Sequence, residues 1–345
     1  MRLSHSCMPF VVAFPTQQNE FLLEGYRLGF EFFGGVSRRQ IYDNMRTAVK
    51  KGWGRYVTEK QKAILLLEAH YAYRSEFCRP GKGNDKGLAE NLVGWIRRNF
   101  LVPMPRVESW SQFNEILAGH CREYANHHIE RHPDSVGEAF IRDKSHLLPL
   151  PASPLDTSKT TKVKVHTDCL IRFDNSFYSV PSRFTGESVT VKGSLEQVNV
   201  YRSGECIASH SRSFKAGSVS YKLEHYINLL EIRPRSVRQA QPVRHTVDDK
   251  ICQFRDYLSD DSAGDKEFIS VLRMVLEYGQ GPVLKAIQRC LASRTYSSEA
   301  VRFELLQAVG KSPEVSAIPH LDKYGFGVKS TDLAIYDKLM LAGDQ

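Results

Sequence analysis

The chain has 345 residues, of which 41% are hydrophobic, so it is long enough for two or three domains that each have a core. Its formal net charge of +8 favours an anionic partner, and nucleic acid is the usual one. Seven widely spaced cysteines argue against a zinc site and against a secreted disulfide framework. The chain shows neither an apolar run of transmembrane length nor a signal peptide, so we expect a soluble, cytoplasmic protein.

The first elements are a short apolar run and a helix. Residues 8–14 form an uninterrupted apolar run, which predicts a buried strand that Pro15 ends. Thr16 is the expected cap of the helix that follows, because apolar side chains recur there at helical spacing up to Phe32. The pair Gly34-Gly35 is expected to end this helix.

Two strands and two helices are predicted next. Residues 36–42 and 73–78 resemble strands, and residues 58–70 form an amphipathic pattern with Thr58 as the expected cap. Asp43 directly follows the first of these strands. Glu90 falls in the early turns of a helix expected over residues 86–100. The other interpretations are that Asp43 begins a turn and that the helix dipole favours Glu90.

An acid at the end of a strand and another near the start of a helix suit two-metal phosphoryl transfer. Carboxylate oxygens are the ligands that Mg²⁺ prefers, and two such ions activate the attacking oxygen and stabilise the leaving oxygen. Arg46, Lys82 and Lys86 lie close in sequence to the two acids and are candidates for binding nucleic-acid phosphates. A solvated, functionally neutral surface is the alternative for each of these cations.

Helices are expected from about residue 109 to 128 and from 135 to 147, and a proline-rich linker follows at 148–154. Four histidines lie in or after the first helix, at positions 120, 127, 128 and 132. Their spacing lacks the His-Glu-x-x-His arrangement of a zinc protease, so we interpret them as a polar helix face rather than a metal site.

Short alternating strands separated by turns at Gly186, Gly193-Ser194 and Ser203-Gly204 predict a small β-barrel over residues 151–215. Five cations of this region could contact a DNA backbone: Arg172, Arg183, Lys192, Arg202 and Arg212. The alternative is a barrel that serves as a spacer or an oligomer contact.

The C-terminal third is predicted to be helical. Residues 233–245 contain four arginines and no acid, which indicates a basic connector that lies along phosphates, with Arg233, Arg235 and Arg238 as candidate nucleic-acid contacts. At least three helices are expected between residues 247 and 309. The tail at 311–345 has helix breakers and no strong period, so we expect it to be loosely ordered.

Three sequence blocks together resemble a known family. They are Phe30-Glu-Phe-Phe-Gly-Gly-Val36, Ile41-Tyr-Asp-Asn-Met-Arg-Thr-Ala-Val49 and Arg79-Pro-Gly-Lys-Gly-Asn-Asp-Lys-Gly-Leu-Ala-Glu90. Their order and spacing are similar to those of IstA-type transposases, the insertion-sequence 21 family of bacterial DDE recombinases. By this resemblance Asp43 and Glu90 are the second and third acids of the catalytic set.

The resemblance implies an α/β plus β architecture. Residues 1–105 would form part of an RNase H-like integrase catalytic core, 106–150 a helical extension and 151–215 a barrel like that of Mu-type transposases. Residues 216–310 would form the basic connector and a helical C-terminal region, before the tail.

The resemblance also implies a function. It is DNA transposition and DNA integration by Mg²⁺-dependent strand cleavage and transfer, carried out by a homo-oligomer on element-end and target DNA. An ATP-hydrolysing helper protein of the same element would be a further partner.

One departure from the family concerns its first catalytic Asp. Residues 1–42 contain no Asp, and their acids, Glu20, Glu24 and Glu31, fall in the predicted helix. We therefore expect an N-terminally truncated, inactive copy without the helix-turn-helix region and the first Asp. The alternative is a catalytically dead DNA-binding or interaction remnant, and an RNase H-like nuclease with another function fits less well.

Overall fold

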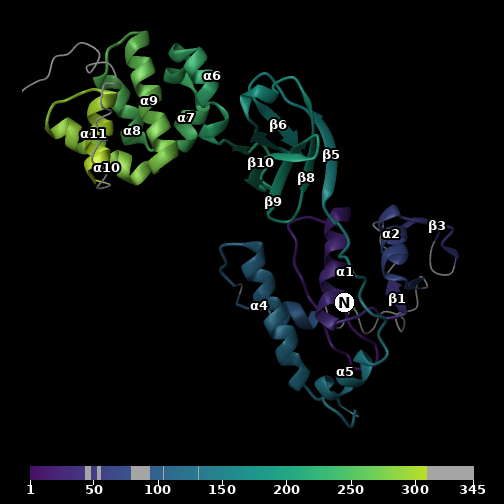
Figure 1. The fold of residues 1–345 in the computed structure, drawn as a ribbon. Helices are drawn as coiled ribbons and strands as arrows, with labels where there is room; N and C mark the ends of the chain where they lie inside the picture. Colours follow the sequence, from purple (N-terminus) through teal and green to yellow (C-terminus); the bar gives the residue numbers. More distant parts are fainter. Residues whose placement is uncertain (43–47, 53–55, 79–93, 104, 131, 309–345) are drawn as a thin grey trace, which may run out of the picture. The chain divides into compact units, whose positions relative to one another are not determined.

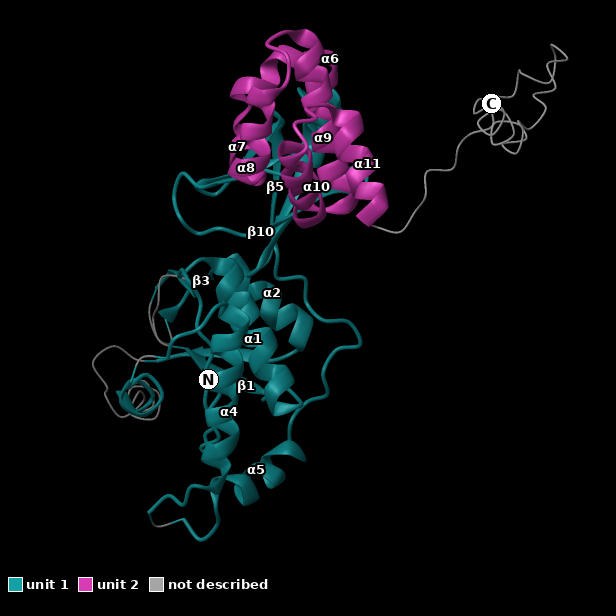
Figure 2. Cartoon of the chain, turned by 90° about the vertical axis from the view of Figure 1, so that its left-hand side faces the viewer, with its two compact units in different colours: residues 1–229 teal, residues 230–345 magenta. Residues whose placement is uncertain are grey.

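The computed structural model describes the chain except for residues 43–47, 53–55, 79–93, 104, 131 and 309–345 (Figure 1). The chain divides into two compact units, Met1–Leu229 and Leu230–Gln345 (Figure 2). The first unit mixes helices and sheets, and the described part of the second is helical. Within the described ranges, every helix is too short or too polar to cross a membrane.

Helix α1 (Asn19–Phe33) ends where the sequence predicts. Gly34 adopts a left-handed conformation with φ of 74°, and its N–H donates to the carbonyl of Glu31 over 3.1 Å. Glycine reaches this conformation without a Cβ clash, so the predicted stop is confirmed. Gly35 is required for another reason, since a Cβ there would lie 2.8 Å from the carbonyl oxygen of Leu148.

Two expectations about the N-terminal segment are wrong. Thr16 does not cap α1, because Gln18 occupies the N-cap position and makes no side-chain cap. Residues 8–14 do not form a strand, although Met8 and Phe10 are buried, and only Pro9 forms a bridge, to Arg2. The apolar run packs against the core without joining a sheet.

A parallel pair of strands lies beside α1. β1 (Arg39–Tyr42) pairs with β4 (Arg74–Phe77), so that Tyr42 lies opposite Phe77. Helix α2 (Lys62–Tyr71) connects the two strands in sequence. Both predicted strands are confirmed with shorter bounds. The carboxyl ends of β1 and β4 therefore lie side by side.

The helix after residue 58 starts later than expected. Residues Glu59–Lys60 form β3, which pairs with β2 (Val49–Lys51), and Gln61 takes the N-cap position of α2. Thr58 is therefore not the cap. One apolar cluster joins α1, β1, α2 and β4, and its buried members are Phe30, Val36, Tyr42, Ala48, Ile64, Leu67, Tyr71 and Tyr73.

Four further helical segments complete the first part of the unit. Residues 94–99 are helical, and α4 (Trp110–Glu123) begins at Ser109, whose side chain accepts a hydrogen bond from the Gln112 N–H. α4 is followed by η3 (Tyr124–Asn126), so the helix expected up to residue 128 is too long by five residues. α5 (Val136–Lys144) begins with a capping box between Ser135 and Glu138.

Residues 159–225 form the part that we call the β domain, because the segment after its last strand is held by the hydrogen bonds that Ser179 forms with Lys222 and His225. It contains β5 (Lys159–Lys164), β6 (Leu170–Phe173), β7 (Ser176–Ser179), β8 (Ser188–Gly193), β9 (Gln197–Arg202), β10 (Glu205–Ser211) and β11 (Val219–Ser220). They form one sheet in the order β10-β9-β8-β5 and another in the order β11-β7-β6. The strands are confirmed. Their pairing among described residues gives two sheets and no closed circuit, so the barrel stays a prediction.

The core of the β domain consists mainly of valines and aromatic rings. Its buried members are Val165, Ile171, Phe173, Tyr178, Val180, Val189, Val191, Val198, Val200 and Ala208. In β8 and β9 the buried residues alternate with less buried ones, as expected where one face of a sheet covers a core.

The second unit is a helical bundle. Its elements are α6 (Ile227–Ile232, which begins just before the unit boundary), η6 (Pro234–Gln239), α7 (Gln241–Thr246), α8 (Asp249–Gln253), η7 (Phe254–Tyr257), α9 (Ser262–Tyr278), α10 (Gln280–Ala292) and α11 (Ser298–Ala308). The predicted helices of this region are confirmed. α9, α10 and α11 supply most of the core, including Leu272, Ile287 and Leu305.

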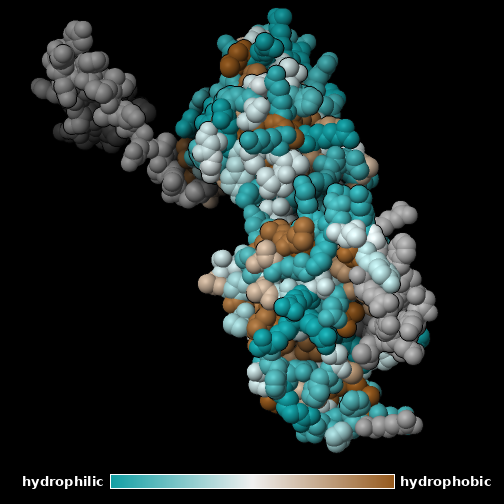
Figure 3. Space-filling view, turned by 90° about the vertical axis from the view of Figure 1, so that its right-hand side faces the viewer, coloured by the Kyte–Doolittle hydropathy of each residue, from teal (hydrophilic) through white to brown (hydrophobic). Residues whose placement is uncertain are grey.

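Hydrophobic side chains at the surface are scattered. Val102, Ile141 and Ile232 are 69%, 71% and 76% exposed and lie far apart in the sequence. On the face drawn in Figure 3, hydrophobic residues form separate patches among hydrophilic ones. Single exposed apolar residues are normal for proteins, so charged and polar groups are better guides to function.

Candidate active site and nucleic-acid interface

The predicted catalytic residues lie outside the described residues. These are Asp43 and Glu90, and the same holds for the candidate phosphate contacts Arg46, Lys82 and Lys86. The structure does describe the strands that lead to both segments. Tyr42 ends β1 and Phe77 ends β4, and the Cys78 N–H donates to the Tyr42 carbonyl over 2.9 Å.

Buried tyrosines support this edge of the strand pair. The hydroxyl groups of Tyr42 and Tyr73 are 2.5 Å apart, and the ring of Tyr26 lies 5.4 Å from that of Tyr42. Burial raises the pKa of Tyr26 to about 12 and also raises the pKa of Tyr42 and Tyr73. The three phenols therefore stay protonated at neutral pH and act as hydrogen-bonding and packing groups next to the end of β1.

A second polar link joins α2 to β4. Glu68 of α2 accepts hydrogen bonds from the Lys60 ammonium over 2.6 Å and from the Ser75 N–H over 2.8 Å. Burial acts to raise the pKa of the Glu68 carboxyl, but these bonds outweigh it and the pKa is lowered. The ionised carboxylate helps to fix the position of β4.

The acids that precede Asp43 are all paired. Glu24 and Glu31 accept hydrogen bonds from Arg27 on the same helix, each at 2.6 Å, and Glu20 pairs with Arg212. The Thr157 hydroxyl also donates to Glu24 over 2.6 Å. All three carboxylates of α1 therefore form ion pairs with arginines.

The histidines do not form a metal site within the described ranges. His120 lies on α4 with Nδ1 3.3 Å from Glu123, whereas His127 stacks on the Tyr124 ring after the helix has ended. Among the described residues, no three His, Cys, Asp or Glu side chains lie close enough together to hold a metal ion. The predicted polar helix face holds for His120 but not for His127.

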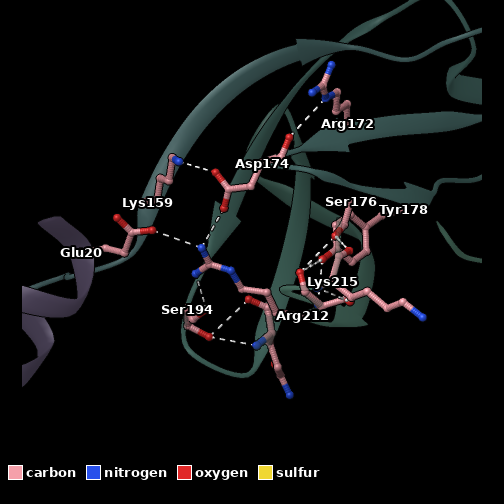
Figure 4. A network of polar contacts seen from close by, with 11 residues as sticks. Glu20, Lys159, Arg172, Asp174, Ser176, Tyr178, Ser194, Arg212 and Lys215 are labelled. Carbon is pink, nitrogen blue, oxygen red and sulfur yellow. Dashed lines mark hydrogen bonds and ion pairs between the residues drawn. The ribbon is translucent and has the colours of Figure 1, made fainter. Parts of the chain in front are cut away.

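A buried arginine joins the β domain to helix α1 (Figure 4). The guanidinium of Arg212 lies 3.1 Å from Glu20 of α1 and 2.8 Å from Asp174, and it donates to the Ser194 carbonyl over 2.6 Å. Lys159 of β5 forms the other ion pair of Asp174. The Arg212 side chain is only 1% exposed.

Three aromatic rings surround the same guanidinium. Its Cζ lies 5.2 Å from the ring centres of Phe21 and Phe173 and 4.7 Å from that of Phe214. Cation–π attraction is strongest where water is excluded, as it is here. We call Arg212 with Glu20, Asp174 and these rings the Arg212 cluster.

The Arg212 cluster corrects one expectation about the DNA surface. Arg212 cannot line an exposed surface, because its charge is buried and neutralised. Arg202 pairs with Glu187 over 2.5 Å and Lys192 with Asp156 over 2.9 Å, but both cations stay partly exposed. Arg172 is exposed and donates to the Asp174 carbonyl over 3.2 Å.

The arginine-rich stretch at 233–245, predicted to be a basic connector, is helical and partly buried. It folds into η6 and α7, and Val237 and Val243 from these helices are buried in the second unit. Arg233 and Arg235 are exposed, as a phosphate contact requires. The burial of Val237 and Val243 was not predicted from the sequence, because the apolar residues of this stretch are few and are separated by arginines.

Arg238 has a structural role in the described unit. Its Nε lies 2.9 Å from Asp265, which is fully buried on α9, and its Nη1 lies 2.5 Å from the exposed Asp260. Arg255 of η7 pairs with the same Asp265 oxygen over 2.6 Å. Asp265 thereby ties η6 and η7 to α9, and Arg238, whose side chain is 38% exposed, is shared between two acids.

Sequence reasoning missed Glu20 and Asp265, the two acids that organise these clusters. Each lies in the first turn of a helix, where the dipole alone favours an acid. No local signal indicates that their partners come from distant segments.

Comparisons with known proteins agree with the resemblance in sequence. Residues 150–222 match the family model of the Mu transposase C-terminal domain. The chain is 28% identical to a transposase of Aminobacter aminovorans, over 85% of this chain and 58% of that protein. It is also 28% identical to the transposase for insertion sequences IS1326/IS1353 of Pseudomonas aeruginosa, over 92% of this chain and 63% of that protein.

A third relative is the transposase for insertion sequence element IS21 of Pseudomonas aeruginosa. It is 28% identical over 66% of this chain and 60% of its own length. The chain thus spans about three fifths of the length of these relatives.

Proposed function

Because the chain is a homologue of insertion-sequence transposases of the IS1326 and IS21 type, we propose that it acts in DNA transposition and DNA integration by metal-dependent strand cleavage and transfer. The observation that carries the proposal is the 28% identity to a named insertion-sequence transposase across 92% of this chain. Asp43 and Glu90 are the residues proposed to carry the chemistry.

The strand pair β1–β4 supports an RNase H-like catalytic core. Parallel strands joined through a helix place their carboxyl ends at the same edge, and binding sites of open α/β sheets lie at such edges. In the sequence, Asp43 directly follows Tyr42 at the end of β1, and the segment that contains Glu90 comes after Cys78 at the end of β4. In the same proposal, the two sheets of the β domain correspond to a small barrel that follows the catalytic core.

Magnesium is the proposed cofactor. Asp43 and Glu90 offer carboxylate oxygens, the donors that Mg²⁺ prefers. A bound pair of such ions would activate the attacking oxygen and stabilise the leaving oxygen of a phosphoryl transfer. The described part of the chain contributes to this site by fixing β1 and β4 through the Tyr42–Tyr73 hydrogen bond and through Glu68.

DNA is the proposed partner, as element ends and as target. The net charge of +8 and the exposed Arg233 and Arg235 support this partner. We further propose, from the resemblance in sequence alone, a homo-oligomer that pairs DNA ends and an ATP-hydrolysing helper protein of the same element. A cytoplasmic location is consistent with seven cysteines that are all free.

A second candidate function is DNA binding without strand cleavage. The ion pairs of the acids that precede Asp43 favour it. Glu20, Glu24 and Glu31 are paired with arginines on α1 and in the β domain, so these three carboxylates already serve as ion-pair partners.

One experiment separates the two candidates. The purified chain, Asp43→Asn, Glu90→Gln and the control Glu76→Gln are compared for duplex binding and for nicking of supercoiled plasmid with Mg²⁺. Glu76 is an exposed acid of β4 paired with Arg39, so its change tests only the loss of a surface charge. Nicking that is lost in Asp43→Asn and Glu90→Gln but kept in the control supports the enzyme.

The other results are equally informative. Binding without nicking by the native chain supports the second candidate. A native chain that binds no duplex even at 50 mM salt would contradict both.

A further inference from the structure

One face of the four-stranded sheet β10-β9-β8-β5 is turned away from the core. Side chains of a strand alternate between the two faces of its sheet. Val163, Val189, Val191, Val198 and Val200 pack into or against the core of the β domain. The residues between them therefore point outward.

The strand register defines this outward face. Lys162 lies opposite Thr190, Thr190 opposite Tyr201, and Lys192 opposite Asn199. We call this surface the lysine face. Its members are Thr160, Lys162, Lys164, Ser188, Thr190, Lys192, Gln197, Asn199, Tyr201, Cys206, Ser209 and Ser211.

The charge of the lysine face has one sign. Three of its twelve members are lysines, and the other nine are uncharged. Lys162 and Lys164 are exposed, and no ion pair to either occurs within the described residues. Lys192 is held by Asp156, which lies outside the sheet and whose side chain is 63% exposed.

The uncharged members also suit a phosphate backbone. Hydroxyl and amide side chains of Ser, Thr, Asn, Gln and Tyr are common contacts to phosphate oxygens, beside Lys and Arg. Four strands at about 4.8 Å spacing make a surface about 14 Å across, and Lys162 and Lys164 are about 7 Å apart along β5. By contrast, the second sheet exposes Val219, which is 41% exposed.

We infer that the lysine face is a docking surface for the phosphate backbone of double-stranded DNA. This inference rests on the proposed function, which supplies DNA as the polyanion that meets these lysines. The contact is expected to be independent of base sequence, because lysines and hydroxyl groups of this face would meet phosphates rather than base edges. The Arg212 cluster would hold this surface on helix α1.

The test measures duplex binding by the full chain as a function of salt. Lys162→Gln/Lys164→Gln is compared with Lys215→Gln/Lys222→Gln, which removes the same charge from the β domain but outside the lysine face. Lys215 is exposed next to the second sheet, where its carbonyl accepts from Ser176. All four side chains are at least partly exposed, so each variant is expected to keep the thermal midpoint of the native chain.

The lysine-face variant is expected to bind a 30-base-pair duplex about tenfold more weakly per lysine at 50 mM salt. Its slope of log affinity against log salt is expected to fall by about one for each lysine, while the control changes affinity less than about twofold. Equal affinities and slopes for the two variants would overturn the inference.

The failure of the proposed function is distinguishable from this result. A native chain without any duplex binding would remove DNA as the partner and the inference with it. A native chain that binds DNA, with the lysine-face variant binding equally well, would leave the proposed function standing and place the DNA contacts elsewhere.

Discussion

The guanidinium of Arg212 and the carboxylate of Glu20 form an ion pair with an N–O distance of 3.1 Å, although 192 positions separate them in sequence. Their side chains are 1% and 10% exposed. Because Glu20 lies on α1 and Arg212 follows β10, the pair connects two parts of the first unit that the sequence assigns to different domains. Asp174 shares the same guanidinium, so the buried cation balances two partly buried acids.

Replacing Arg212 by methionine is expected to destabilise the first unit. The change keeps the volume approximately but removes the counter-charge of Glu20 and leaves Asp174 paired with Lys159. Breaking a buried ion pair in this way costs about 3–5 kcal/mol. Urea unfolding of the native chain and of Arg212→Met measures the difference.

Arg172→Met is the matched control for this change. Arg172 is an exposed arginine of the same domain whose Nε donates to the carbonyl of Asp174, so the expected loss is below about 1 kcal/mol. Equal losses of unfolding free energy in the two variants would show that the buried ion pairs of Arg212 stabilise the fold no more than an exposed arginine does.

Two buried imidazoles make the stability of the β domain depend on pH. The Lys222 N–H donates to Ser179 Oγ over 2.9 Å, so the Ser179 hydroxyl can donate to Nδ1 of His225, 2.7 Å away. His210 Nε2 donates to the Ser179 carbonyl over 2.6 Å. Burial lowers the pKa of both histidines, and with the neighbouring His210 it brings the pKa of His225 to about 3.

The sign of the effect follows from proton binding. Between about pH 6.5 and pH 3 the unfolded chain takes up a proton at position 225 and the folded chain does not. The free energy of unfolding is therefore expected to fall as pH drops below 6.5, by up to about 2 kcal/mol from this group at pH 5. Urea midpoints at pH 7 and pH 5 measure it.

His225→Asn is expected to show a smaller difference between the two pH values than the native chain. His166→Asn changes an exposed histidine of the same domain and should keep the native difference. If both variants keep it in full, another group is responsible for the pH dependence.

Asp265 is expected to be essential for the stability of the second unit. Its carboxylate is fully buried, and one of its oxygens binds both Arg238 and Arg255. Asp265→Asn removes the charge that holds η6 and η7 on α9 and leaves Arg255 buried without an anion, at a cost of about 3–5 kcal/mol. The thermal midpoint of the second unit reports this loss.

Asp260→Asn provides the comparison, because Asp260 pairs with the same Arg238 but is 90% exposed. Exposed ion pairs contribute about 0–1 kcal/mol, so this variant should unfold close to the native midpoint. A large loss for Asp260→Asn and none for Asp265→Asn would contradict the assignment.

The sequence predicts elements better than their connections. The parallel strands, the strands of the β domain and the helices α9 to α11 follow from apolar periodicity and from turn residues such as Gly34 and Gly204. Cap positions were less predictable, since Gln18 and Gln61 precede their helices without a side-chain cap. Tertiary packing stabilises these helix starts in place of the expected threonines.

The polar clusters were not predictable from the sequence. Sequence reasoning assigned Arg212 to an exposed DNA surface, because composition and spacing give no information about its partner Glu20, which lies 192 positions away. The arginines of residues 233–245 present the same difficulty, since Arg238 is bound by acids more than twenty positions later. Ion pairs of this kind depend on the folded chain rather than on any local pattern.

Asp156 is expected to weaken the docking of DNA on the lysine face. It holds Lys192 through an ion pair of 2.9 Å, and its pKa is lowered by the hydrogen bond of the Ser158 hydroxyl and by that of Lys192. Asp156→Asn removes this competition and one negative charge beside the sheet. Duplex affinity at 50 mM salt is therefore expected to rise several-fold, with a steeper salt dependence by about one unit of slope.

Glu224→Gln is the matched control, because it also releases a lysine, Lys222, from an ion pair of 3.5 Å in the same domain. Lys222 is not a member of the lysine face, so its release should change duplex affinity less than about twofold. A gain of equal size in both variants would indicate a response to net charge alone. A gain confined to Asp156→Asn would indicate that Lys192 contacts phosphate, because only that variant frees a lysine on the sheet.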